Sequence, residues 1–139
     1  MFIIEEDYDN KLRIFIRKIR VMGKNKNRYI YKICTISEWN NASLKGHYSG
    51  SELDLRDKFI HFSTAQQVEE TLRLHFDKIN NLCLLKVSTE GLNIKWEKSR
   101  NNQLFPHLYN TLDTKKVIEV INILKDKSSS YNITNLKLE

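Results

Sequence analysis

The chain has 139 residues, of which 40% are hydrophobic and 29% are charged, a mixture typical of one globular domain. One proline and four glycines exclude a collagen-like or a Pro/Gly-rich low-complexity sequence. The formal net charge is +6, but Lys and Arg are dense only between Lys11 and Arg28. Because nucleic-acid-binding proteins gather their basic residues in a patch, we do not expect nucleic acid as a partner.

The cysteine content and the apolar runs indicate the compartment. Cys34 and Cys83 each stand in an apolar run, without a Cys-x-x-Cys pattern. We expect two buried thiols in a reducing compartment. No apolar run approaches the roughly 18 residues of a membrane span, and Glu5, Glu6 and Asp7 interrupt the region where a signal peptide is apolar. The sequence therefore predicts a cytoplasmic protein without a membrane span.

Residues 1–28 differ in composition from the rest and are predicted to form an N-terminal extension, either mobile or an extra strand. The basic, apolar-interleaved residues 11–22 suit a segment that binds a membrane surface or a partner. The alternation in Arg13-Ile-Phe-Ile-Arg suits an edge strand. A third interpretation is that translation begins at Met22.

The predicted domain covers residues 29–125 and opens with a strand over residues 28–35. Thr35-x-x-Glu38 is a capping-box pattern that predicts a helix ending at Gly46. Residues 47–57 are predicted as a polar loop and residues 59–62 as a buried strand. Ser63 then suits the N-cap of a helix. The apolar residues of that helix recur on one face at Ala65, Val68, Leu72 and Phe76.

The second half of the domain reads mostly as strands. Residues 82–87 form an apolar run of strand length, and residues 92–97 alternate between apolar and polar. Pro106 removes a backbone donor, so residues 105–109 are predicted as an edge strand or a rigid loop. Residues 116–124 suit a helix or a strand, and residues 126–139 are predicted as a C-terminal tail. This irregular mixture predicts an α+β domain with a mostly antiparallel sheet.

His61, Glu97 and His107 each stand inside an aromatic or apolar string, and we predict them as catalytic residues. Pockets are built from convergent polar groups on an apolar wall, where pKa values shift. His61 ends a predicted strand just before a predicted helix start, whose N–H groups favour anions. Glu97 alternates with Trp96 and therefore faces a cleft or solvent if Trp96 is in the core.

Each of these residues also has a structural interpretation. His61 suits a core histidine bonded to the backbone, Glu97 a surface ion pair, and His107 a histidine in a turn. No pair has the short-range spacing of metal ligands, so no metal is predicted. Five further residues are predicted to bind a ligand or cofactor, as helix-start hydroxyls, as a phosphate-binding arginine or at the pocket edge: Ser63, Thr64, Arg100, Lys32 and Tyr109.

Four spaced motifs follow one another along the chain: Tyr48-x-Gly50-Ser51-x-x-Asp54, Phe59-Ile60-His61-x-Ser63-Thr64, Trp96-Glu97-x-Ser99-Arg100 and Phe105-Pro106-His107-Leu108-Tyr109. In this order they resemble the bacterial domain-of-unknown-function family 952. The similarity runs from about Tyr29 to Leu124. The family pattern usually has glycine at the position of Lys58 and often at that of Asn110, so a positive φ would strain Lys58.

The resemblance implies an ADP-ribosyltransferase-like fold, with a split, bent sheet and flanking helices, and a strand at residues 116–124. By this analogy NAD is a possible cofactor, although a fold does not establish a function. We expect a protein that binds a nucleotide-like or phosphorylated small molecule in a His/Glu-lined cleft. As an NAD-using transferase it would use Glu97 to stabilise positive charge and His61 to contact the leaving base. The alternative is a non-catalytic binding or protein-interaction module.

Overall fold

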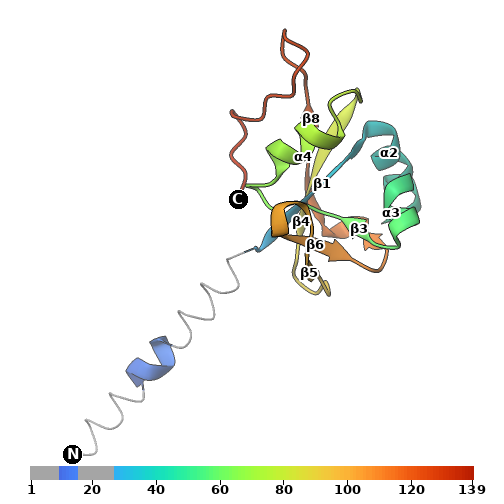
Figure 1. Ribbon diagram of the computed structural model, residues 1–139. Coiled ribbons are helices and arrows are strands. Elements are labelled where there is room, and N and C mark those ends of the chain that lie inside the picture. The colour runs from blue at the N-terminus through green and yellow to red at the C-terminus, as the bar shows by residue number, and fades with distance from the viewer. Residues whose placement is uncertain (1–9, 16–26) are drawn as a thin grey trace, which may run out of the picture.

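The computed structural model describes residues 10–15 and 27–139. Residues 10–15 are helical, whereas one expectation for the stretch beginning at Arg13 was an edge strand. The remainder of the predicted extension, residues 1–9 and 16–26, lies outside the described residues. From Tyr29 onwards helices alternate irregularly with antiparallel strands (Figure 1), which confirms the predicted α+β class.

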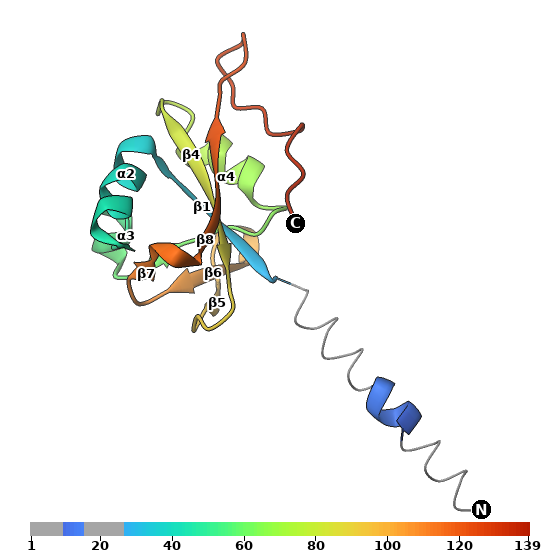
Figure 2. The same ribbon diagram turned by 180° about the vertical axis from the view of Figure 1, so that it is seen from behind.

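The first sheet has three antiparallel strands: β1 (Tyr29–Thr35), β4 (Leu82–Ser88) and β8 (Val117–Ile123), in the order β1-β4-β8. The apolar run of the central strand β4 is buried because both of its faces are covered. Strand β8 forms one edge of this sheet (Figure 2), so nearly all of the ambiguous residues 116–124 are a strand, as the family resemblance favoured.

The second sheet contains β3 (Ile60–His61), β6 (Leu104–Leu108) and β5 (Lys95–Lys98), in the order β3-β6-β5. Its pairing sets His61 opposite His107. A short pair, β2 (His47–Tyr48) with β7 (Leu112–Asp113), completes the strands. Single-turn 3-10 helices cover Arg100–Asn102 (η1) and Thr114–Lys116 (η2).

Strand β6 lies in the centre of its sheet, so the prediction of an edge strand or a rigid loop for residues 105–109 was wrong. The carbonyl of Pro106 accepts the N–H of Phe62 at 3.0 Å. Because the amide and carbonyl of one strand residue point to the same side, the missing N–H of Pro106 also points towards β3. Strand β3 ends at His61. The proline therefore removes no bond from the ladder with β5.

Two helices begin with a capping box. Helix α2 (Ile36–Lys45) has the box predicted from Thr35 and Glu38, and it ends at Gly46 with φ 83°, as expected. Helix α3 (Glu52–Asp57) falls in the segment that was predicted as a polar loop, and that prediction was wrong. Its box uses Ser51 and Asp54, with Asp in place of the usual Glu or Gln.

Helix α4 (Val68–His75) begins at Val68 and not at Ser63, so the predicted N-cap was wrong. The backbone N–H and C=O of Ser63 instead bond to those of Tyr31, both at 2.8 Å, which keeps Ser63 extended. The following turn is closed by Gln67, whose side-chain oxygen accepts the N–H of Thr64 at 3.1 Å. Helices α2 and α3 lie on one side of β1 and α4 on the other (Figures 1 and 2).

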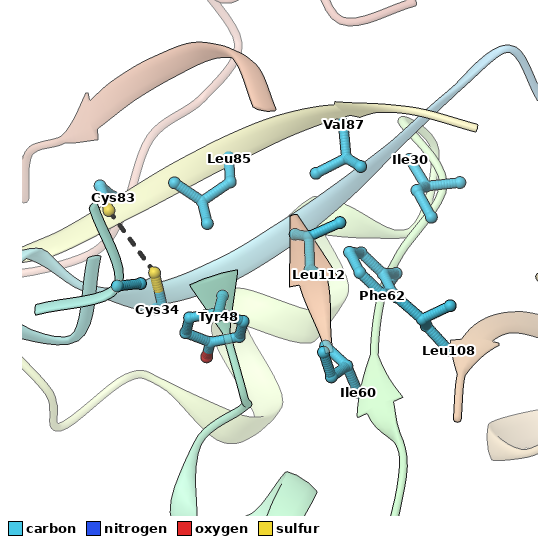
Figure 3. Packing of buried hydrophobic residues seen from close by; sticks show 11 residues of the cluster. Ile30, Cys34, Tyr48, Ile60, Phe62, Cys83, Leu85, Val87, Leu108 and Leu112 are labelled. Carbon is cyan, nitrogen blue, oxygen red and sulfur yellow. Dashed lines mark hydrogen bonds between the residues drawn. The ribbon is translucent and has the colours of Figure 1, made fainter. Parts of the chain in front are cut away.

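The apolar side chains form two buried clusters. One lies between the two sheets and contains the facing pair Cys34 and Cys83 (Figure 3). The other lies under α4 and contains Leu72 and Leu82. Ile133, from the predicted tail, is 7% exposed and belongs to this second cluster, so residues after 125 contribute to the core. None of the helices in the described part of the chain has the length and hydropathy that crossing a bilayer requires.

Candidate functional site

A cleft of about 830 Å³ is lined by β1, the end of β3, the N-terminal turn of α3, helix α4 and residues of η1 and β6. Its walls are partly apolar, with Tyr31, Phe76 and Phe105 among them. This combination is typical of small-molecule sites. The titratable and hydroxyl side chains in its lining include Lys32, Asp54, His61, Thr71, Arg100 and His107.

Asp54 is a buried carboxylate with four partners. It accepts the backbone N–H groups of Ser51 (2.8 Å) and His61 (3.1 Å) and lies 2.7 Å from Lys32 Nζ. The fourth partner, His61 Nδ1, is 2.6 Å away. Burial alone would raise the pKa of Asp54, but the His61 hydrogen bond and the charge of Lys32 outweigh it and hold the pKa well below its ordinary range. Asp54 is therefore ionised at neutral pH.

His61 has both ring nitrogens paired with carboxylates. Nδ1 faces Asp54, and Nε2 lies 3.1 Å from Asp57 Oδ2, one helical turn further along α3. The ring is 31% exposed and lines the cleft. Because both nitrogens are engaged, a ligand can bond to this imidazole only if it displaces a carboxylate.

His107 differs from His61 in having one free nitrogen. Its Nδ1 lies 3.0 Å from Glu97 Oε1, which also accepts the hydroxyl of Tyr109 at 2.7 Å. These two bonds, that of Tyr109 first, hold the pKa of Glu97 below its ordinary value. Nε2 of His107 has no hydrogen-bond partner among the described residues, and it is not one of the fully buried unpaired atoms.

The ring of Phe59 packs against the imidazole rings of both His61 and His107. Its ring centroid is 4.1 Å from that of His107, in a stacked arrangement, and 4.4 Å from that of His61. The two imidazole centroids are 5.5 Å apart. Their short separation follows from the β3–β6 register, which pairs the two residues directly.

Arg100 forms a second polar feature of the cleft. One Nη lies 3.3 Å from Thr71 Oγ1 and 3.6 Å from Glu70, and the guanidinium lies 5.0 Å from the Phe105 ring centre. Its Nε is buried and has no hydrogen-bond partner in the described part of the chain. A buried donor without an acceptor is uncommon and requires an explanation.

The structure brings together most, but not all, of the predicted site residues. The cleft is lined by Lys32, His61, Ser63, Arg100 and His107. Lys32 is 4% exposed and lies in the floor rather than at the pocket edge.

Three predicted residues lie outside the cleft lining. Glu97 and Tyr109 are not part of it, although they contact His107, which is. Thr64 lines a separate pocket of about 550 Å³, beside Arg28 and Glu139. The anion site expected at a helix start beside His61 was wrong, because α4 begins at Val68.

The sequence analysis did not select four residues that contact His61, His107 or Arg100. They are Phe59, Asp54, Asp57 and Thr71. Asp54 had a usable signal, since Ser51-x-x-Asp54 resembles a capping box in which the acid could also meet a partner. Asp57 and Thr71 stand in polar surroundings and have no comparable signal. The described residues contain no group of three or more His, Cys, Asp or Glu arranged to hold a metal ion.

Solved structures of one bacterial protein are similar to this chain. The X-ray crystal structure of protein CC0527 from Caulobacter crescentus is 38% identical, with a TM-score of 0.73, over 77% of this chain and 96% of that chain. A double mutant of CC0527 gives the same values. Its solution NMR structure is 37% identical, with a TM-score of 0.70, over 78% and 95% of the two chains.

Among curated proteins none matches the chain. The model of the family described as "Protein of unknown function (DUF952)" matches residues 33–120. This range contains the His61, Glu97 and His107 motifs, so the match and the motifs agree. The chain belongs to the DUF952 family.

Proposed function

We propose that the protein binds a small anionic molecule, nucleotide-like or phosphorylated, in the cleft, and that His107 exchanges a proton with it. The observation that carries the proposal is that one cleft contains two polar groups that no described residue satisfies. These are Nε of Arg100 and Nε2 of His107. A buried donor such as Nε of Arg100 normally has a partner, and one ligand in the cleft can supply that partner together with a donor for Nε2 of His107.

Among the described residues, Arg100 is the cleft cation with an unpaired donor, although Glu70 lies 3.6 Å from its guanidinium. The positive charge of Lys32 is matched by Asp54 at 2.7 Å. Arg100 keeps a donor free, and guanidinium groups bind phosphate and carboxylate through paired N–H groups. The volume of about 830 Å³ lies within the usual range for small-molecule sites. Apolar walls next to Arg100 suit a ring or another apolar portion of the same ligand.

An NAD-using transferase is a narrower version of this proposal. It derives from the resemblance to the ADP-ribosyltransferase-like fold, by analogy alone. In this version Glu97 would act on the ribose, but its Oε1 is bonded to Tyr109 and His107. We therefore assign to Glu97 a contact with His107 rather than with the ligand, and we retain NAD and ADP-ribose as test ligands.

A non-catalytic binding module is the second candidate function. One observation favours it: both nitrogens of His61 are engaged by Asp54 and Asp57, as in a structural histidine. The two candidates differ in what His107→Ala does. In a catalyst this variant binds ligand but does not convert it, whereas in a binding module no conversion occurs in either protein.

Titration calorimetry and amide NMR of the full chain with inorganic phosphate, AMP, ADP-ribose and NAD test the proposal. We expect at least one ligand to bind and Arg100→Met to weaken that binding by about tenfold or more, the loss typical of a charge-assisted hydrogen bond. Arg73→Met is the matched control, because Arg73 is 69% exposed on α4. The proposal fails if no ligand binds at millimolar concentration, or if Arg100→Met and Arg73→Met bind equally.

A further inference from the structure

We infer that Glu97 is a positioning residue which, together with Tyr109, fixes His107 in the Nδ1–H tautomer and so presents Nε2 to the cleft as a proton acceptor. The inference deepens the proposed function and rests on it only for the identity of the ligand. The inference adds one property of the ligand that the proposed function does not specify. The bound molecule offers an O–H or N–H donor to Nε2 of His107.

The hydrogen-bond chain runs from an exposed residue to a buried one. Tyr109, at one end of these hydrogen bonds, is 46% exposed, and the Glu97 side chain is 42% exposed. The His107 side chain is 7% exposed. Glu97 therefore reaches His107 from an exposed position outside the cleft lining, whereas the imidazole belongs to that lining.

The chemistry of the three groups gives the bonds a direction. A carboxylate can only accept, so a neutral His107 must carry its proton on Nδ1 to bond with Glu97 at 3.0 Å. The Tyr109 hydroxyl donates to the same oxygen at 2.7 Å and favours the ionised form of the acid. Carboxylates commonly set the tautomer of a functional histidine in this way.

The packing leaves the imidazole little freedom to turn over. Phe59 stacks on it at 4.1 Å, and the His61 ring lies across from it at 5.5 Å. A ring flip would put Cδ2 in the place of Nδ1 and Cε1 in the place of Nε2, so the bond to Glu97 at 3.0 Å would be lost. The stacked Phe59 ring and the strand position of His107 oppose that exchange. The charged groups nearest to this cluster are Glu97, Lys95 next to Tyr109, and Asp54, Asp57 and Lys32 around His61.

Nitrogen-15 NMR of the histidine side chains in the free, full-length protein tests the inference. In wild type the neutral form of His107 is expected to carry its proton on Nδ1. Glu97→Ala removes the acceptor and is expected to abolish this preference. Glu97→Gln is expected to retain it, because the amide oxygen can still accept from Nδ1–H. Glu119→Ala, at an exposed position on β8, is the matched control and is expected to leave His107 unchanged.

An Nε2–H tautomer in wild type, or an unchanged His107 spectrum in Glu97→Ala, overturns the inference. If Glu97→Ala does not fold, as judged from its amide spectrum, Glu97→Leu and the wild-type assignment decide the question in its place. The measurement needs no ligand. Failure of the phosphate and nucleotide titrations with a correct tautomer would therefore contradict the proposed function alone.

Discussion

Lys32 Nζ lies 2.7 Å from Asp54 Oδ2 at the floor of the cleft, and the two side chains are only 5% and 1% exposed. Removing two charges from water is expensive unless their remaining hydrogen-bonding capacity is satisfied. Here Lys32 also donates to the His61 carbonyl at 3.0 Å, and Asp54 accepts two backbone N–H groups. The pair therefore joins β1, α3 and β3 at one point.

Asp54→Asn should destabilise the protein strongly, because it leaves the buried Lys32 without a counter-charge. We expect the free energy of unfolding to fall by about 3–5 kcal/mol. Urea unfolding followed by circular dichroism measures it. Asp113→Asn, at an exposed position, should lose no more than about 1 kcal/mol. A loss below about 1 kcal/mol for Asp54→Asn would show that the pair adds little.

The same carboxylate predicts a dependence of stability on acid pH. The pKa of Asp54 is lowered in the folded state, so its stabilisation is complete above the unfolded pKa of about 3.9 and is lost as pH falls from there towards the folded pKa. Between about pH 4 and about pH 2 the wild-type free energy of unfolding should therefore drop more steeply than that of Asp54→Asn. Parallel pH profiles for the two proteins would refute this assignment.

Lys58→Gly should stabilise the protein, since Lys58 ends α3 with φ 66° and ψ 25°, in the left-handed region. The sequence pattern anticipated this strain at Lys58, whereas Asn110 is not among the described residues with positive φ. Relief of about 1–2 kcal/mol, less the entropy cost of glycine, leaves a gain of about 0.5–1 kcal/mol. Lys58→Ala keeps the strain and is the matched control. Equal thermal midpoints for the two variants would contradict the prediction.

The segment after residue 125 should contribute measurably to stability through Ile133, which is 7% exposed in the cluster under α4. Ile133→Ala is expected to reduce the free energy of unfolding by about 2–4 kcal/mol. Leu124→Ala, at a side chain that is 78% exposed, should change it by no more than about 0.5 kcal/mol. If both substitutions have the same small effect in urea unfolding, the segment does not stabilise the core.

Cys34 and Cys83 should be unreactive in the native protein. They lie opposite each other on β1 and β4, with their sulfur atoms 3.7 Å apart and both residues about 1% exposed. The hydrogen bond with Cys83, together with burial, raises the pKa of the Cys34 thiol. A thiol reagent such as dithionitrobenzoate should therefore label neither cysteine until guanidinium unfolds the chain. Rapid labelling of the native protein would contradict the burial of either thiol.

Local patterns in the sequence were sufficient for several elements. The capping box at Thr35 and the αL glycine at Gly46 delimit α2, because both act through neighbouring backbone groups. The apolar run of residues 82–87 became the central strand of the first sheet. Ser63 shows the limit of such patterns. Its predicted role as an N-cap was overridden by backbone bonds to Tyr31, a partner distant in sequence.

For the candidate site, too, some features follow from the sequence and others only from the tertiary structure. The sequence alone determined the family, the α+β class and the residues most worth examining, because motifs and periodicity are properties of neighbouring residues. Only the tertiary structure decided that Glu97 bonds to His107 and that both nitrogens of His61 face carboxylates. It also decided that Asp54, which was not predicted as a site residue, pairs with Lys32. These contacts depend on strand order, register and the packing of α3, which join residues far apart in the chain.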